Sequence, residues 1–542
     1  MMNVTYREEG VASAASSVAG RLVADGVPAR LAGGDPTLWG EDAEAEAADG
    51  RPGRLGWLTL PRSSRELLPV LGELAGRARA AGLTNVVLAG MGGSSLAAEV
   101  ICATYDVPLT VLDTTDPGQV RRALTERLEE TALVVASKSG STVETDCQLR
   151  IYERLFAEAG PDPAGRVVVI TDPGSRLERR AAEAGYELVL APPGVGGRYS
   201  ALSAFGLVPA ALAGADVARL LDDADEVLPL LSLDTGNPGL DLGAALGGAA
   251  LAGRDKLLLE DQLSATTGLP DWVEQLVAES TGKQGRGILP VVSADPNGSG
   301  DELVVAIESD VGDVRVDGPL GAQFLVWEYA TAIAGLLLGV DPFDQPSVAE
   351  SKENTAALLA LPDLPTGTPA FVDGPVVAYG PSTAKDLPGL FAELLRTIPG
   401  DGYLAIMAYL DRLAAFDAPV PDGADFEQMT DAWMMADPAT LRALLALRTD
   451  RPVTFGWGPR FLHSTGQYHK GGPQNGVFLQ ITGAVADDVA VPGRPYGLGR
   501  LQLAQALGDL GALETRGRPA VRLHLTDRAA GVARLLEAAQ EA

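Results

Sequence analysis

The feature that most constrains the fold is a run of short apolar segments separated by helical stretches. Each segment is rich in Leu or β-branched residues and lacks polar alternation, which is typical of parallel strands buried on both faces. The first series consists of Val86–Ala89, Leu109–Leu112, Leu133–Ala136, Val167–Ile170 and Leu188–Leu190. Strand and helix alternate here over about 110 residues, which predicts a doubly wound α/β domain over residues 76–234.

Further series of the same kind follow. Lys256–Leu259, Leu289–Val292 and Leu303–Ile307 alternate with helical stretches such as Gly321–Leu338 and predict a second such domain over 235–360. After a Pro-rich linker, a third α/β region over 370–542 has candidate strands at Val376–Ala378, Val453–Phe455, Val477–Ile481 and Val521–Leu525. Residues 1–75 are expected to form a helical N-terminal segment. The expected fold class is thus α/β, with two doubly wound parallel-sheet domains and a C-terminal α/β region.

Charge and composition exclude several function classes. A formal net charge of -30 argues against a general nucleic-acid or anionic-membrane surface. Residues 1–9 lack a signal-peptide profile, and the apolar stretch Leu325–Val340 is interrupted by Glu328 and is short for a membrane span. The chain has two cysteines and three histidines, without ligand-like spacing. We therefore expect a cytoplasmic protein without a metal site or cofactor.

Two loops at predicted strand ends carry phosphate-binding chemistry. Residues 90–95, Gly-Met-Gly-Gly-Ser-Ser, follow one strand, and residues 137–142, Ser-Lys-Ser-Gly-Ser-Thr, follow another. Glycines allow close backbone approach, and hydroxyls, a lysine and a helix N-terminus form a cradle for phosphate. A plain turn explains the first loop equally well, whereas four hydroxyls in six residues exceed what helix capping requires in the second. Carboxyl ends of neighbouring strands in such sheets form the ligand crevice.

Two later motifs are ambiguous in isolation. Gly196-Gly197-Arg198-Tyr199-Ser200 presents a guanidinium beside exposed backbone, but a surface arginine in a loop explains it better. In residues 275–283, Gln-Leu-Val-Ala-Glu-Ser-Thr-Gly-Lys, Gln275 and Glu279 share a helix face, but a solvated glutamate is the simpler interpretation.

Taken together, the motifs resemble those of the phosphoglucose isomerase family, which has two sugar-isomerase (SIS) domains. That family shows G-x-G-G-S, S-K-[ST], G-G-R-[YF]-S, Q-x-x-x-E-S-x-G-K and F-D-Q-x-x-V-x-x-x-K segments. This chain carries all five in that order, the last as Phe343-Asp344-Gln345-Pro346-Ser347-Val348-Ala349-Glu350-Ser351-Lys352. The resemblance covers about residues 85 to 355.

The resemblance implies a role for each matching residue. Glu279 would be the base that moves a proton between C2 and C1, Arg198 with Gly197 would stabilise the enediolate, and Lys352 would lie at the sugar ring. Gln275 would contact substrate. The positions that would hold the phosphate or line the sugar site are Gly92, Gly93, Ser94, Ser137, Lys138, Ser139 and Thr142. A poised carboxylate and a fixed positive charge suit this chemistry.

The chain departs from the family at one point. The family has a G-Q-H segment between base and lysine whose histidine helps to open the ring, and no histidine lies between Glu279 and Lys352 here. The segment 458–473, which carries His463 and His469, is similar to the C-terminal part of the isomerase portion of bifunctional transaldolase/phosphoglucose isomerases. We expect one of these two to act in ring opening, with His469 favoured because His463 follows an apolar pair. His524 lies in an apolar run and is expected to be structural.

The implied activity is the interconversion of glucose 6-phosphate and fructose 6-phosphate through an enediolate, in a homo-oligomer. A dual enzyme that also accepts mannose 6-phosphate is an alternative, for which Thr281 beside the base is a weak indication. A non-catalytic sugar-phosphate sensor would need neither the base nor the arginine. An amide-transferring isomerase would need an N-terminal nucleophile domain, and the chain begins Met1-Met2-Asn3.

Overall fold

The computed structural model describes residues 2–40, 54–261, 264–292, 298–420 and 423–542. The chain divides into two compact units. Unit 1 comprises residues 1–113, 124–295 and 300–345, and unit 2 comprises residues 114–123, 296–299 and 346–542. The chain therefore enters unit 2 briefly through most of helix α7 (Pro117–Thr125) before it returns to unit 1.

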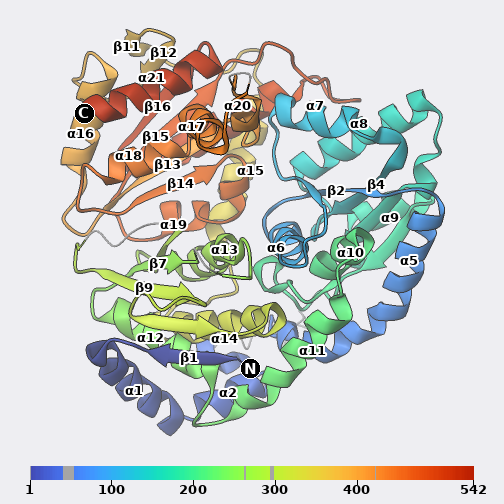
Figure 1. Ribbon diagram of the computed structural model, residues 1–542, viewed down its shortest axis with the longest axis vertical. Helices are drawn as coiled ribbons and strands as arrows, with labels where there is room; N and C mark the ends of the chain where they lie inside the picture. The colour runs from blue at the N-terminus through green and yellow to red at the C-terminus, as the bar shows by residue number, and fades with distance from the viewer. Residues whose placement is uncertain (1, 41–53, 262–263, 293–297, 421–422) are drawn as a thin grey trace. The chain divides into compact units, whose positions relative to one another are not determined.

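The first sheet of unit 1 has five parallel strands in the order β3–β2–β4–β5–β6 (Figure 1). They are β2 (Asn85–Gly90), β3 (Thr110–Leu112), β4 (Thr131–Ala136), β5 (Val167–Thr171) and β6 (Glu187–Leu190). Every residue of β4 and β5 is buried, as expected of strands covered on both faces. Helices between or after the strands are α6 (Leu96–Thr104), α8 (Val143–Ala159), α9 (Arg176–Ala184), α10 (Ala204–Ala213) and α11 (Val217–Val227). The strand order reverses between β2 and β4, which makes their carboxyl ends the expected ligand crevice.

The second sheet of unit 1 has the order β1–β10–β9–β7–β8. Its strands are β1 (Asn3–Tyr6), β7 (Lys256–Glu260), β8 (Leu289–Val292), β9 (Glu302–Ile307) and β10 (Val314–Asp317), of which β1 alone is antiparallel to its neighbour. The predicted N-terminal helical segment thus also supplies an edge strand. It continues with α1 (Glu9–Ala24), α2 (Val27–Ala32), the short helix α4 (Leu60–Ser63) and α5 (Leu68–Ala80).

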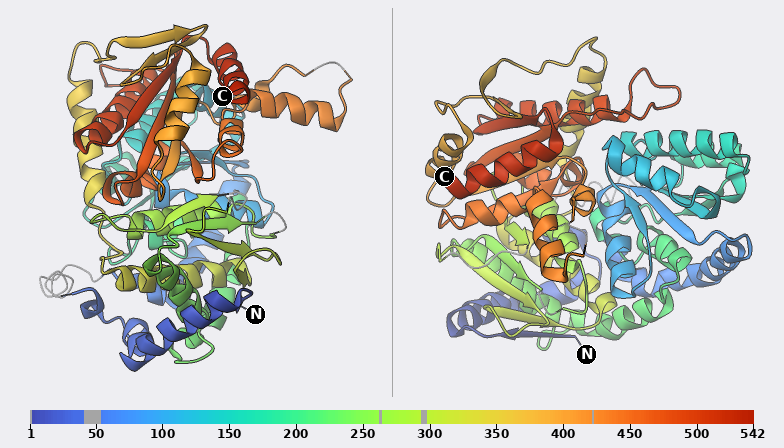
Figure 2. Two further views of the ribbon diagram at one scale, coloured as in Figure 1. Left: turned by 90° about the vertical axis from the view of Figure 1, so that its left-hand side faces the viewer. Right: turned by 45° about the horizontal axis from the view of Figure 1, so that its top comes forward.

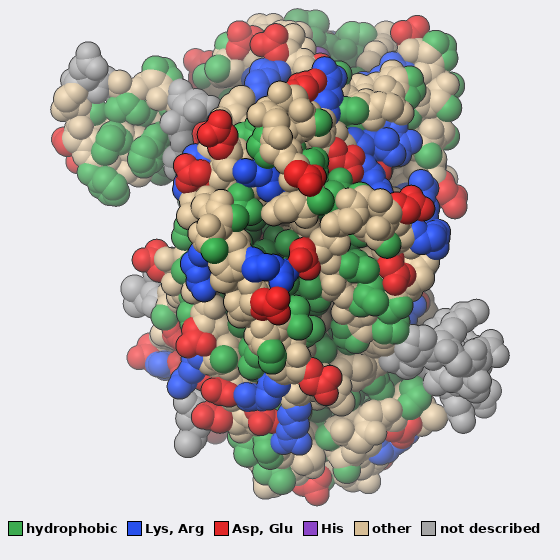
Figure 3. All heavy atoms as spheres, turned by 90° about the vertical axis from the view of Figure 1, so that its right-hand side faces the viewer, with side chains coloured by type: hydrophobic (Ala, Val, Ile, Leu, Met, Phe, Trp, Pro, Cys, Tyr) green, Lys and Arg blue, Asp and Glu red, His purple; other side chains and the backbone are tan. Residues whose placement is uncertain are grey.

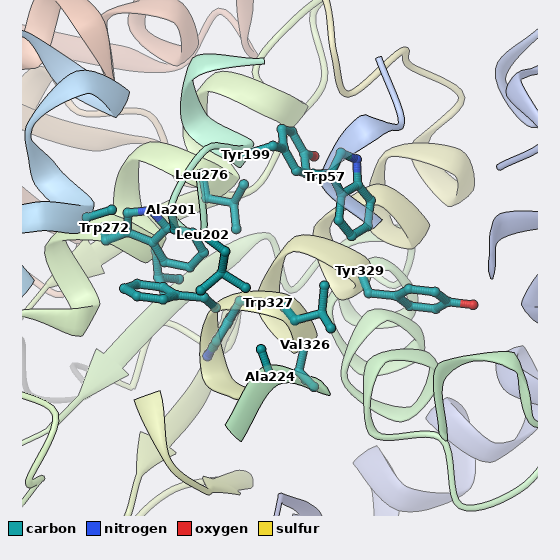
Figure 4. Packing of buried hydrophobic residues seen from close by; sticks show 14 of the residues in the cluster. Trp57, Tyr199, Ala201, Leu202, Ala224, Trp272, Leu276, Val326, Trp327 and Tyr329 are labelled. Carbon is teal, nitrogen blue, oxygen red and sulfur yellow. The ribbon is translucent and has the colours of Figure 1, made fainter. Parts of the chain in front are cut away.

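An aromatic core fixes the helices of unit 1. Helix α12 (Pro238–Leu251) packs along α14 (Leu320–Leu338), and α13 (Leu269–Thr281) packs on α14 through Trp272 and Phe324, whose ring centroids lie 4.7 Å apart. Figure 4 shows Trp57 beside Tyr199, with ring centroids 5.3 Å apart. Helix α14 has the length and apolar character of a membrane span, but 89% of its most apolar window is buried, as in the core helix of a folded protein.

Unit 2 contains a six-stranded sheet in the order β11–β12–β16–β15–β13–β14. The strands are β11 (Pro369–Asp373), β12 (Val376–Tyr379), β13 (Tyr403–Tyr409), β14 (Val453–Trp457), β15 (Gly476–Gly483) and β16 (Ala520–Leu525), and the last four are parallel. The helices are α15 (Pro346–Leu359), α16 (Leu387–Thr397), α17 (Phe426–Ala436), α18 (Thr440–Ala446), α19 (Gly466–Gly471), α20 (Leu498–Thr515) and α21 (Arg528–Glu541). Figure 2 shows α17 projecting from the rest of unit 2.

The predicted α/β class is confirmed, and each predicted strand segment is a strand. Four strands were not predicted, namely β1, β10, β11 and β13. The predicted domain boundaries stay predictions.

Candidate active site

The two predicted phosphate loops lie at the same edge of the first sheet. The short 3-10 helix η4 (Gly92–Ser94) follows β2, and residues 137–142 follow β4. Strands β2 and β4 are paired in register as far as Gly90 and Ala136, so both loops start at the same level of the sheet. The structure therefore brings together the two loops that the sequence placed at strand ends.

The loop at Gly93 packs directly on the segment that carries the arginine. A Cβ added at Gly93 would lie 2.1 Å from the carbonyl oxygen of Gly197, so no side chain fits. The hydroxyl of Ser200 donates to the Gly93 carbonyl at 3.2 Å. The 3-10 helix η7 (Gly197–Tyr199) is thereby held against η4. Glycine is required here for close approach of two backbones.

The Arg198 guanidinium is buried and fixed on several sides. Its side chain is 3% exposed. Nε donates to the hydroxyl of Ser280 at 2.8 Å, Nη1 donates to Oε1 of Gln345 at 3.1 Å, and Nη2 donates to the carbonyl oxygens of Pro342 and Asp344 at 2.6 and 2.8 Å. A cation held this way keeps its position while charge develops beside it, which is the condition for electrostatic stabilisation of a reaction intermediate.

The carboxylate of Glu279 lies next to this guanidinium. Glu279 is 4% exposed, and its Oε1 is 3.3 Å from Nη1 of Arg198. Its Oε2 accepts a hydrogen bond from Nε2 of Gln275 at 3.1 Å, one turn earlier on α13. Because Trp272 anchors α13 in the core, the carboxylate has a fixed direction. A buried carboxylate beside a fixed cation can take a proton from a carbon whose neighbouring oxygen becomes negative.

The hydroxyl-rich loop has its own internal order. The hydroxyls of Ser137 and Thr142 are 2.9 Å apart, and those of Ser139 and Ser141 are 2.8 Å apart. Lys138 is held at the edge of the loop, where its Nζ donates to Oδ2 of Asp172 at 2.5 Å. Burial raises the pKa of Asp172, and the Lys138 ammonium opposes that shift. Residue 142 precedes helix α8, so an anion at this loop also meets a helix N-terminus.

Three residues of the site have roles that the sequence did not reveal. Ser280 and Gln345 bind Arg198 directly. Lys283 is 1% exposed, and its Nζ donates to the carbonyl oxygens of Asp341 and Asp344 at 2.5 and 2.7 Å and also to the Asp344 carboxylate. All three lie inside the motifs already noted, which was the available signal. The hydroxyl of Thr281, the residue noted above for mannose 6-phosphate, binds backbone groups instead. It donates to the Val277 carbonyl and accepts from the Ile288 amide.

The remaining predicted residues belong to unit 2. Lys352 is exposed on α15. His469 is 3% exposed on α19, where its Nδ1 is 3.0 Å from the Tyr403 hydroxyl and its ring stacks on that of Tyr403. Burial, with help from Lys470 and Arg518, holds the pKa of His469 well below its usual value. His463 is only partly buried, although it follows the buried pair Phe461 and Leu462.

His524 lies on β16 and its Nδ1 is 3.0 Å from the Thr482 hydroxyl, within the sheet. Across the described ranges, no group of three or more His, Cys, Asp or Glu side chains is placed to hold a metal ion.

Several known proteins of similar sequence are named glucose-6-phosphate isomerase. No family model matches the chain. It is 31% identical over 387 residues to the glucose-6-phosphate isomerase of Rubrobacter xylanophilus, an alignment that covers 57% of this chain and 89% of that protein. It is also 31% identical over 399 residues to the glucose-6-phosphate isomerase of Symbiobacterium thermophilum, with 57% and 88% covered.

A solved structure, that of a hypothetical protein from Thermus thermophilus, is 26% identical with a TM-score of 0.56, and the match covers 67% of this chain and all of that one. The parallel α/β sheets and these relatives define the class of the chain, a phosphosugar isomerase. Within that class, both relatives are aligned over nearly nine tenths of their length. The chain belongs to the glucose-6-phosphate isomerase family.

Proposed function

We propose that this chain interconverts glucose 6-phosphate and fructose 6-phosphate, with Glu279 as the base and Arg198 as the enediolate-stabilising cation. Glu279 takes the proton from C2 of the open-chain aldose, and the electron pair moves onto O1 to give the enediolate. Glu279 then returns the proton to C1 while the O2 proton passes to O1, so that C2 becomes the carbonyl carbon of the ketose. The single observation that carries this proposal is the buried pair in which Oε1 of Glu279 lies 3.3 Å from a guanidinium fixed by four other hydrogen bonds.

The phosphate is proposed to bind at the switch point of the first sheet. Ser94, Ser137, Ser139 and Thr142 would supply hydroxyls, with Gly92 and Gly93 supplying backbone and Lys138 a nearby charge. Basic and acidic side chains are intermixed on the face that Figure 3 shows. Gln275, held against Glu279, would contact the sugar.

Ring opening is proposed for Lys352 with His463 or His469. The family resemblance supports Lys352, and the partial exposure of His463 supports it over the buried His469.

We also propose a homo-oligomer in the cytoplasm. Helix α17 supports an oligomer, because it exposes Phe426, Met434 and Met435, with Phe426 75% exposed. The two cysteines, Cys102 and Cys147, are both described and form no disulfide, which suits a reducing compartment. The molecular mass of the purified chain in solution tests whether it forms a homo-oligomer.

The base is tested with Glu279→Gln. The amide oxygen can still accept from Arg198, but the group cannot take a proton. Turnover of fructose 6-phosphate in a coupled assay should fall by at least ~10² while the dissociation constant for substrate changes less than a few-fold. Glu274→Gln, on the same helix, is the control and should keep turnover within about two-fold. Activity of Glu279→Gln near that of the wild type would remove Glu279 from its role.

A further inference from the structure

A further cavity lies wholly within unit 2. It has a volume of about 660 Å³ and is bounded by α15, α20, the linker after α15 and the ends of β12 and β16. Its polar lining includes Asn354, Thr366, Thr368, Thr515 and Arg522. Small-molecule sites in proteins occupy about 300–1,000 Å³ and combine apolar walls with a few placed polar groups. We call this space the Arg522 cavity.

Arg522 is an unusual lining residue. It lies on β16, is 1% exposed, and its Cζ is 4.0 Å from the centroid of the Tyr379 ring. Its Nη2 donates to the Thr366 carbonyl at 2.6 Å, and its Nη1 donates to the Thr482 hydroxyl at 3.3 Å. A guanidinium has five N–H donors. These two bonds use two of them, and the Tyr379 side chain also forms a hydrogen bond with the group. Nε is buried without a partner among the described residues.

The positive charge of Arg522 lies over the Tyr379 ring, which interacts favourably with it. No carboxylate of the described chain forms an ion pair with it, although most buried charges in proteins are paired. Burial lowers the pKa of Arg522, as expected for a cation held away from water. A buried guanidinium with in-plane donors to spare is a ready partner for the two oxygens of a carboxylate or phosphate.

The rest of the lining limits the kind of anion. The hydroxyls of Thr368 and Thr515 and the amide of Asn354 are suited to bind ligand hydroxyl groups. Glu514 also lines the cavity and is exposed at its rim. We propose that the Arg522 cavity binds a small hydroxylated organic oxyanion, a carboxylate or a phosphate monoester, with Arg522 as its anchor.

Isothermal titration of the full chain tests this proposal with two probes, glycerate and glycerol 3-phosphate. They share a hydroxylated three-carbon skeleton and differ in the anion. The probe that binds more tightly therefore shows whether the cavity prefers a carboxylate or a phosphate. The titrations use a chain with Ser139→Ala and Thr142→Ala, which weakens the proposed catalytic phosphate loop. At least one probe should bind at millimolar concentration or below, and Arg522→Gln should weaken it by at least ~10-fold. Arg522→Lys should be intermediate, because it keeps the charge but loses the planar fork.

The matched control is Arg500→Gln. Arg500 also donates to a linker carbonyl, that of Leu361, but does not line the cavity, so its loss should leave binding unchanged. If Arg522→Gln does not fold, judged by circular dichroism, Thr515→Val and Asn354→Ala should each weaken the probe ~3-fold or more. The proposal is overturned if neither probe binds at 10 mM (roughly the upper limit for a specific small-molecule site), or if cavity variants and control bind alike.

Discussion

At the scale of single residues, Glu328 is a buried carboxyl group in the middle of an apolar helix. It is 1% exposed on α14, and neither oxygen has a hydrogen-bond partner in the described part of the chain. Burial raises its pKa well above the ordinary 4.5. The folded chain therefore holds a proton that the unfolded chain releases, and stability falls as pH rises from about 4.5.

Glu328→Gln should therefore stabilise the chain at alkaline pH. We expect its Tm to exceed that of the wild type by ~2 °C or more at pH 8, with a smaller difference at pH 5. The exposed Glu66 provides the control, because Glu66→Gln should leave Tm unchanged at both values. Equal effects of Glu328→Gln at pH 5 and pH 8 would contradict a raised pKa.

Lys283 is predicted to be a positioning residue rather than a catalytic one. Its ammonium and Arg198 both bind the segment 341–345, and Asp344 O accepts from each. Burial, together with the charge of Arg198, lowers the pKa of Lys283 to about 8. Loss of its proton removes a donor and loosens that segment, so kcat should decline above about pH 8.

Lys283→Met should lower kcat by ~10-fold or more, because a lost positioning contact weakens stabilisation of the transition state more than binding of the substrate. The variant should also lack the alkaline decline in kcat. The measurement is the pH profile of kcat for fructose 6-phosphate, with Lys385→Met, an exposed lysine of unit 2, as the control. A variant that keeps the alkaline decline would assign the decline to another group.

Sequence motifs predicted which side chains form this candidate site, but not the hydrogen bonds and ion pairs between them. Arg198 and Glu279 stand in segments with a strong family pattern, and both loops follow recognisable buried strands. The bonds of Lys283 to Asp341 and Asp344 join residues about 60 apart and depend on where the segment after α14 folds back. Likewise, the pairing of Lys138 with Asp172 needs the positions of two neighbouring strand ends.

At the scale of elements, the contact between η4 and η7 is predicted to tolerate no side chain at Gly93. Gly93→Ala would place a Cβ 2.1 Å from the Gly197 carbonyl, and backbone cannot move aside as a flexible side chain can. We expect a lower Tm, by ~4 °C or more, and a loss of at least ~10² in kcat/KM, because the displaced η7 carries Arg198.

Gly196→Ala is the matched control for stability. Its added Cβ would meet nothing nearer than the Tyr199 ring at 3.8 Å, which is ordinary contact, and its φ is -67°. Thermal unfolding of the two variants should therefore differ clearly. Equal Tm values for Gly93→Ala and Gly196→Ala would show that η4 and η7 are not in close contact.

Elements were predicted well where apolar β-branched runs mark them. The unpredicted strand β13 reads Tyr-Leu-Ala-Ile-Met-Ala-Tyr, and it contains only one β-branched residue among good helix formers. It becomes a strand because it lies between β14 and β15, with every residue buried. The edge strand β1 is similarly defined by a partner, β10, more than 300 residues away.

At the scale of the whole molecule, experiments should distinguish the roles of His463 and His469 in unit 2. His463→Ala should slow turnover of cyclic fructose 6-phosphate by ~10-fold or more and leave an open-chain analogue nearly unaffected, because histidine exchanges protons near neutral pH. His469→Ala should instead lower Tm, since it removes a ring packed against Tyr403 and Phe478. Wild-type turnover by both variants would leave ring opening to Lys352 and water.

Most of α7 belongs to unit 2 although it comes early in the sequence, which affects how the chain folds during translation. Asp116 is fully buried there, where it accepts from Arg528 at 2.7 Å and from Gln502 at 3.2 Å, and Arg122 pairs with Asp411. Asp116 and Arg528 are 412 residues apart. At about 5–20 residues per second, a ribosome takes roughly 20–80 s to travel between them. The segment that leads into α7 is therefore translated early, and the nascent chain carries the Asp116 carboxylate without Arg528 until α21 has emerged.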